Sequence, residues 1–162
     1  MAREYGRAPR GERCYDSKPR NWGDNITVIG ALSLAGVEAV MTLKGALTQE
    51  WFAHWVEKFL VPILKPGDLV VLDNLSSHKS AKARELVEAV GAQFIFLPAY
   101  SPDFNPIEQA WSKLKALING AAPRTREALE DALVAALDMV SQEDALGWIL
   151  NAGYRSWLDR FI

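Results

Sequence analysis

The chain has 162 residues, and 49% of them are hydrophobic, so it is long enough to fold as one domain with a sizeable core. Its single cysteine, Cys14, excludes a disulfide framework and a thiolate metal cluster, and two histidines are too few for a histidine-rich metal centre. The net charge of −2 hides a basic arm over residues 1–24 and an acidic remainder. Such an arm permits contact with a phosphate backbone, although charge alone favours a solvated segment.

The first apolar stretch, Ile26 to Leu43, contains one charged residue, Glu38, and could be mistaken for a membrane span. It is rich in Val, Ile and Thr and is interrupted by glycines, which favours two short strands over a membrane helix. The N-terminal residues have no apolar segment of the kind found in a secretory signal. We therefore expect a cytoplasmic protein with no membrane partner.

The first half of the chain predicts a hairpin followed by a helix. Residues 25–34 and 37–43 have the composition of paired antiparallel strands. From Thr48 onward, apolar residues recur at intervals of three and four, which predicts a helix. That helix should end within residues 62–66, because proline and then Gly67 interrupt it.

The middle of the chain predicts two parallel strands joined by a helix. Residues 68–73 and 93–97 are short, nearly continuous apolar runs of the kind that is buried on both faces of a sheet. A helix over about residues 80–90 lies between them, and Gly91 has the position of a C-terminal cap. Strand, helix and strand at this spacing form a parallel crossover unit.

The last third of the chain predicts helices. Asn105 has the position of an N-cap, and Pro106 occupies the first turn, where proline is favourable. Two further helices are expected over residues 125–139 and 141–152, so that residues 125–162 form a helical C-terminal end. The predicted fold class is α/β.

Two acidic residues stand where such a fold builds its sites, at the carboxyl ends of parallel strands. Asp73 closes the first buried strand, and Glu108 opens the helix that follows the second one. Adjacent strands lie only about 4.8 Å apart, so the two carboxylates can converge although thirty-four residues separate them. Converging carboxylates repel one another unless a cation lies between them. Hard oxygen ligands without a Cys or His cluster indicate Mg²⁺ or Mn²⁺ rather than zinc.

Each of these residues also has a simpler interpretation. Asp73 followed by Asn74 is a common way to shape a turn. Glu108 comes three residues after Asn105, the spacing of a capping box, and His78 could be a loop histidine bonded to the backbone. Taken singly, each simpler interpretation is the better prediction. Their joint placement on one sheet edge favours the metal site.

Two segments resemble a known family. They are Val-Val-Leu-Asp-Asn-Leu-Ser-Ser-His-Lys, over residues 70–79, and Phe-Leu-Pro-Ala-Tyr-Ser-Pro-Asp-Phe-Asn-Pro-Ile-Glu-Gln-Ala-Trp-Ser-Lys-Leu-Lys, over residues 96–115. In order, composition and spacing the chain resembles the DDE domain of bacterial insertion-sequence transposases related to the mariner group. Residues 5–13 and 151–154 take part in the resemblance, which therefore covers nearly the whole chain.

The resemblance implies a fold and a reaction. The fold would be ribonuclease-H-like, a mixed sheet with flanking helices, in a single domain over residues 1–162. Asp73 would be the second acid and Glu108 the third acid of the family, both ligands of Mg²⁺. The family nicks DNA at the ends of a mobile element, and the freed 3′-hydroxyl then attacks target DNA. Exposed basic residues usually only face solvent, but four of them are candidates for contact with DNA phosphates: Arg7, Arg10, Lys79 and Lys113.

The chain departs from the family pattern at its start. In the family the first acid ends a strand that precedes the segment corresponding to residues 5–13. Asp16 and Asp24 are poor substitutes, because both follow that segment in polar surroundings. We therefore expect an N-terminally truncated domain, without the first acid and without the central strand between the hairpin and the Asp73 strand. A helix-turn-helix DNA reader is also expected to be missing.

Three functions follow from this departure. The first is a transposase whose sequence begins here at an internal methionine or after a frameshift, so that it is inactive alone; its partners would be DNA and a second copy of the chain or a full-length transposase. The second is a non-catalytic remnant that associates with full-length transposase or with DNA. The third is a nuclease of the same fold without transposition. The DNA upstream of the Met1 codon distinguishes the first two, because only the first predicts an encoded apolar strand that ends in Asp.

Overall fold

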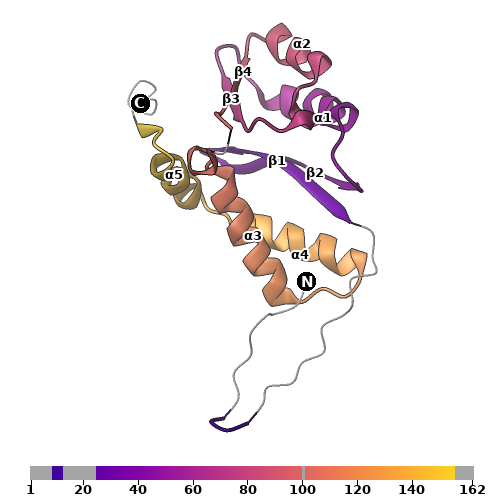
Figure 1. The fold of residues 1–162 in the computed structure, drawn as a ribbon, viewed down its shortest axis with the longest axis vertical. Helices are drawn as coiled ribbons and strands as arrows, with labels where there is room; N and C mark the ends of the chain where they lie inside the picture. The colour runs from indigo at the N-terminus through magenta and orange to yellow at the C-terminus, as the bar shows by residue number, and fades with distance from the viewer. Residues whose placement is uncertain (1–8, 13–24, 100, 156–162) are drawn as a thin grey trace.

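The computed structural model describes residues 9–12, 25–99 and 101–155 (Figure 1). Apart from 9–12, the predicted basic arm over 1–24 lies outside the described residues, as do Asp16, Asp24 and the end of the predicted helical segment, 156–162. None of the described helices is long and apolar enough to cross a membrane.

The predicted hairpin is present as β1 (Ile26–Ser33) and β2 (Gly36–Lys44), which pair antiparallel around a two-residue turn. Their register shifts between Ile29 and Ala31, which marks a β-bulge. Within the bulge, Ala39 of β2 has a φ of 52°, a left-handed conformation that a non-glycine residue adopts only where its surroundings enforce it. The bulge therefore gives the hairpin a fixed irregularity near its centre.

A buried tryptophan is bonded to this irregular segment. The indole Nε1 of Trp55 donates a hydrogen bond of 2.5 Å to the carbonyl oxygen of Ala39, and Trp55 is only 4% exposed. Tryptophan can be buried at low cost only where its N–H finds such an acceptor. The bond thus connects the hairpin to the helix that follows it.

Replacing Trp55 by Phe is expected to lower the free energy of unfolding by about 1–3 kcal/mol, because the Ala39 carbonyl loses its partner in a buried position. Urea denaturation measures this change. Trp51→Phe is the matched control: Trp51 is 46% exposed, so its replacement should change stability by less than about 0.5 kcal/mol. Equal effects of the two substitutions would contradict the assigned role of the hydrogen bond.

The predicted helix after the hairpin is present as three successive turns of different pitch. They are α1 (Gln49–Trp55), a π turn η1 (Val56–Leu60) and a 3₁₀ turn η2 (Val61–Ile63). The hydroxyl of Thr48 caps the start by accepting a bond from the Trp51 amide. The segment ends beside Pro62, as predicted.

The predicted crossover unit is present as β3 (Leu69–Leu72), a 3₁₀ turn η3 (Ser76–His78), α2 (Ala81–Ala89) and β4 (Gln93–Phe96). The two strands pair parallel. Gly91 follows α2 with a φ of 79°, as a C-terminal cap requires. The helix, the strands and α1 share the larger hydrophobic core.

The prediction that both strands are buried on both faces is wrong for the described part of the chain. Val70, Phe94 and Phe96 pack against the core. Leu69 and Ile95 point to the other face, because side chains alternate along a strand, and each remains 37% exposed. Only one face of this strand pair is therefore covered.

The helical end consists of a 3₁₀ turn η4 (Pro102–Phe104) and the helices α3 (Ile107–Ala121), α4 (Arg126–Asp138) and α5 (Gln142–Asn151). These bounds agree with the predictions, except that Pro106 and not Asn105 has the N-cap position of α3. A second hydrophobic core lies between α3 and α4 and contains Leu114, Ile118, Leu133 and Ala136.

The hairpin lies between the two cores (Figure 1). Ile29 belongs to the first core, whereas its neighbour Val28 packs against the second, because successive residues of a strand face opposite sides. Within the described residues the strands form two separate two-stranded sheets, β1–β2 and β3–β4.

Candidate functional site

Asp73 directly follows the last residue of β3, at the carboxyl end of the parallel strand pair. Its side chain is 48% exposed, and its Oδ1 accepts a hydrogen bond of 3.1 Å from the Leu75 amide. The turn-shaping role considered for this residue is therefore real. It occupies one carboxylate oxygen and leaves Oδ2 without a hydrogen bond to any described residue. Oδ2 is thus available to a ligand.

The ring of His78 lies against that carboxylate. Its Nδ1 lies 2.7 Å from Oδ1 of Asp73. The contact has hydrogen-bonding distance but not the angle of a full hydrogen bond, and the buried Nδ1 has no other partner in the described structure. The ring stacks on Phe52 with 4.7 Å between ring centroids, and the side chain is only 17% exposed. The packed ring therefore holds Asp73 from one side and leaves its other oxygen free.

Glu108 lies in the first turn of α3 and is exposed. The capping box considered for it does not form: the start of α3 has no side-chain capping bond, and only the backbone amide of Glu108 reaches Asn105, at 3.1 Å. One turn further on, Trp111 packs against β1 at Gly30, opposite the bulge. Residues three apart share a helix face, so Glu108 lies on the side of α3 that faces β1.

A backbone hydrogen bond joins the two strands where they end, close to Asp73. The amide of Leu97 donates a bond of 2.8 Å to the carbonyl of Leu72, so the exit of β4 lies beside the residue that precedes Asp73. From there the chain passes through η4 into α3 (Figure 1). The described residues contain no group of three or more His, Cys, Asp or Glu side chains able to hold a metal ion. Asp73 and Glu108 are thus at most two members of an ion site.

The four basic residues predicted to contact DNA lie in different environments. Arg7 lies outside the described residues, and Arg10 is exposed in a tight turn over residues 9–12. Lys79 is exposed between η3 and α2, next to the Asp73 segment. Lys113 is engaged inside the protein: its Nζ lies 2.5 Å from Oδ2 of Asp144 and 2.8 Å from the carbonyl of Met139. A phosphate contact would require Lys113 to release both acceptors.

The Lys113 ion pair predicts a pH effect. The hydrogen bond from Lys113, followed by the bond from the Ser141 backbone, lowers the pKa of Asp144 from 3.8 to about 2. This contribution to stability is fully present above pH 3.8 and is lost as the pH falls toward 2. Asp144→Asn should therefore destabilise the protein near neutral pH and lose its disadvantage in acid, measured by urea denaturation over this pH range. An effect of Asp144→Asn that does not depend on pH would contradict the ion pair.

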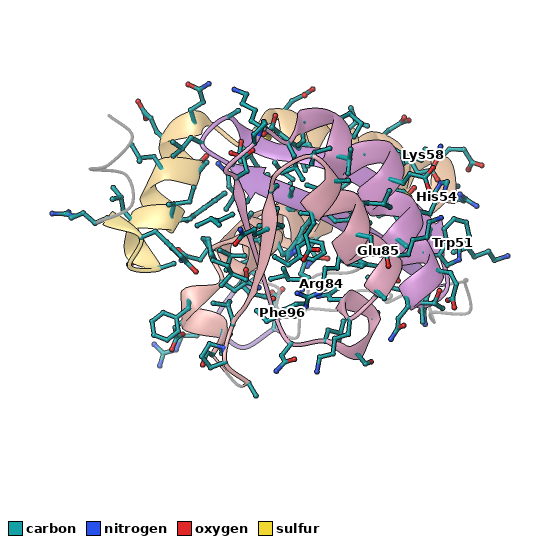
Figure 2. The ribbon with its side chains drawn as sticks, turned by 90° about the horizontal axis from the view of Figure 1, so that it is seen from above. Trp51, His54, Lys58, Arg84, Glu85 and Phe96 are labelled. Carbon is teal, nitrogen blue, oxygen red and sulfur yellow. The ribbon has the colours of Figure 1, made fainter. Side chains whose placement is uncertain are left out.

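Three contacts near the site were not predicted from the sequence. Arg84, on α2, lies over the ring of Phe96, with 5.7 Å from its guanidinium carbon to the ring centroid (Figure 2). Tyr154 donates a bond of 2.7 Å from its hydroxyl to the carbonyl of Phe104, and burial raises its pKa. Asn151 donates a bond of 3.3 Å to the side chain of Gln109. The end of α5 and the residues that follow it therefore bond to the chain on both sides of Glu108.

Comparison with known proteins identifies the family of the chain. Residues 1–130 match the family described as DDE superfamily endonuclease. The chain belongs to this family, and both candidate acids lie within the matched residues. No curated protein was found to match the chain.

Two solved structures share the fold. The structure titled "Crystal structure of the Mos1 Strand Transfer Complex" has a TM-score of 0.71 at 18% sequence identity, over 96% of this chain and 48% of that chain. The structure titled "Mos1 transposase paired-end complex with left transposon end" has a TM-score of 0.67 at 17% identity, over the same shares. The fold is thus the ribonuclease-H-like α/β fold of the Mos1 transposase catalytic domain. This chain spans about half the length of the Mos1 chains it matches.

Proposed function

We propose that the chain is a catalytic-domain portion of a DNA transposase, which cuts DNA strands at the ends of an insertion sequence and joins them to target DNA. The observation that supports this proposal most directly is the carboxylate of Asp73, held by His78 on one oxygen and free on the other. Membership of the DDE superfamily endonuclease family supports the reaction class. The titles of both Mos1 structures name transposition complexes, which supports DNA as the partner.

Asp73 and Glu108 would supply hard carboxylate oxygens to Mg²⁺ or Mn²⁺. A free oxygen on Asp73 and an uncapped carboxylate on Glu108 are the donors that these ions prefer. When bound, such ions activate the attacking oxygen and stabilise the leaving oxygen of a phosphodiester. The residues of this chain would position the two carboxylates. The ring of His78 lies against Asp73, and Glu108 is carried by the first turn of α3.

Among the described residues no third acidic side chain forms a metal-binding group with Asp73 and Glu108. Two acids hold a pair of divalent ions weakly, because the repulsion between the two cations is less well neutralised than with three. We therefore propose that these 162 residues by themselves bind DNA without joining it. The same observation favours the second candidate function, a non-catalytic chain that associates with full-length transposase or with DNA.

A nicking and joining assay with Mg²⁺ or Mn²⁺, on DNA that carries the element's ends, tests this proposal. The chain alone should bind this DNA and join none of it. Joining that requires the metal ion and disappears in Asp73→Ala would show that two acids suffice, and would contradict the need for a third. Absence of DNA binding at low salt would contradict the proposed function itself, because a backbone-binding protein binds most tightly there.

A further inference from the structure

A hollow on the described surface lies next to Asp73 and has a volume of about 430 Å³. Its size is within the range of roughly 300–1,000 Å³ that is usual for small-molecule sites. It is formed by residues of η3, α2 and β4 and of the loops between η3 and its neighbours. The residues that line it are Asn74, His78, Lys79, Ser80, Ala81, Arg84, Phe94 and Phe96.

The charge of this hollow favours an anion. Lys79 and Arg84 line it, no acidic side chain does, and neither residue forms an ion pair with another described residue. The N-terminal end of α2 also opens into it, at Ser80 and Ala81. The Ser80 hydroxyl caps only the Ala83 amide, so other amides of the first turn remain without a helical partner. A phosphate group would meet positive charge on two sides.

The walls of the hollow favour a flat ring. Phe94 and Phe96 line it together, and Arg84 lies over the ring of Phe96, as Figure 2 shows. A guanidinium plane and an aromatic ring are the two surfaces on which proteins stack unpaired nucleic-acid bases. Paired bases in a duplex are stacked within the helix and cannot enter a pocket of this size.

We propose that this hollow binds one unpaired nucleotide of the DNA strand, with its base against Arg84 and Phe96 and its phosphate at Lys79 and the start of α2. The proposal rests on the proposed function, because it takes the ligand to be the strand that reaches Asp73. His78 connects the two sites, since it lines the hollow and contacts Asp73. An unpaired end of the strand held in this way would be positioned beside the candidate catalytic carboxylate.

The test measures binding of a short fluorescein-labelled single-stranded oligonucleotide by anisotropy, in EDTA, so that cleavage does not enter. Arg84→Ala should weaken binding roughly 10-fold, because stacking and charge are both lost. Arg84→Lys keeps the charge and should fall between Arg84→Ala and the unchanged protein. Arg124→Ala removes the same charge from an exposed loop and should weaken binding less than about two-fold.

A second probe isolates the stacking contribution. An abasic oligonucleotide of the same length should bind more weakly to the unchanged protein, and Arg84→Lys should bind it about as well as the unchanged protein does. Phe96→Leu, which keeps an apolar wall, should reduce the fluorescence change of 2-aminopurine placed in the oligonucleotide. Thermal melts show whether each variant is folded; where Phe96→Leu is not, the abasic comparison on Arg84→Lys decides.

Equal loss of affinity in Arg84→Ala and Arg124→Ala, or equal binding of the intact and abasic strands, would overturn the proposal. Its failure is distinguishable from failure of the proposed function. A protein that binds unpaired DNA through Arg84 but never gives a metal-dependent reaction retains the nucleotide site and loses the transposase assignment. Metal-dependent cleavage that is unaffected by Arg84→Ala would support the transposase assignment and contradict the nucleotide site.

Discussion

Replacing Asp73 by Asn is expected to lower the Mn²⁺ affinity of the protein at least about 10-fold, because the substitution removes the charge that attracts the ion and leaves a neutral amide in its place. Glu108→Gln should have an effect of similar size. The double variant should be little worse than either single one, since residues that serve one ion act as a unit and their effects do not add. Electron paramagnetic resonance of free Mn²⁺ measures these affinities without requiring catalysis.

The matched control for this prediction is Asp103→Asn. Asp103 is exposed in η4, between the two candidate ligands in sequence, and the ion site does not include it. Its replacement removes the same charge and should leave Mn²⁺ affinity almost unchanged. Losses of equal size in all three single variants would show diffuse attraction by surface charge, and would contradict a site built from Asp73 and Glu108.

Iron provides an independent test of whether the two acids share one ion. Fe²⁺ with ascorbate and peroxide produces hydroxyl radicals that cut the polypeptide close to the bound metal. Cuts are expected near Asp73 and near Glu108 together, and Asp73→Asn should remove both sets. Cuts near only one of the two residues would show that Asp73 and Glu108 do not bind the same ion.

The second large effect concerns the gap between the two sheets. A two-stranded sheet is marginally stable, and unpaired strand edges promote association with other chains. Neither β1 nor β3 has a second strand partner among the described residues, and Leu69 and Ile95 are exposed on one face of the β3–β4 pair. We therefore expect the 162-residue chain to unfold with a free energy below roughly 5 kcal/mol, or to self-associate.

Light scattering after size exclusion and a thermal melt measure this behaviour. Leu69→Lys and Ile95→Lys should reduce self-association without loss of secondary structure, because charged side chains protect exposed strands. Leu34→Lys is the control, since Leu34 is 46% exposed in the hairpin turn, away from this strand pair. A monodisperse monomer with a steep cooperative melt would contradict the expectation.

The elements and the candidate acids could be predicted because their signals are local. Periodicity gave the helices, and Gly91 and the residues Thr125 and Ser141 marked helix ends where the structure has them. Asp73 and Glu108 followed from strand order, which needs only the sequence of elements. The Asp73 turn was also predictable, because its hydrogen bond to Leu75 spans two residues.

The remaining features depend on contacts between distant segments. Ala39 adopts a positive φ because a bulge and the Trp55 indole enforce it, and alanine itself gives no sign of this. Lys113 was expected to face DNA, yet it lies 2.5 Å from an acid thirty-one residues away. A basic side chain carries no local signal that distinguishes a solvent-facing position from an ion pair. The exposure of Leu69 depends on what covers the sheet, which the strand sequence does not encode.

The bonds from Tyr154 to Phe104 and from Asn151 to Gln109 place Glu108 between two attachments made by the C-terminal segment. A variant of this gene that stopped before Asn151 would still encode both Asp73 and Glu108. A search for the motifs would find both acids, although the chain on both sides of Glu108 would have lost its hydrogen bonds to the C-terminal segment. Among related sequences, the presence of both acids is therefore not enough to predict that the site is correctly formed. The Asn-Ala-Gly-Tyr segment at 151–154 should be checked as well.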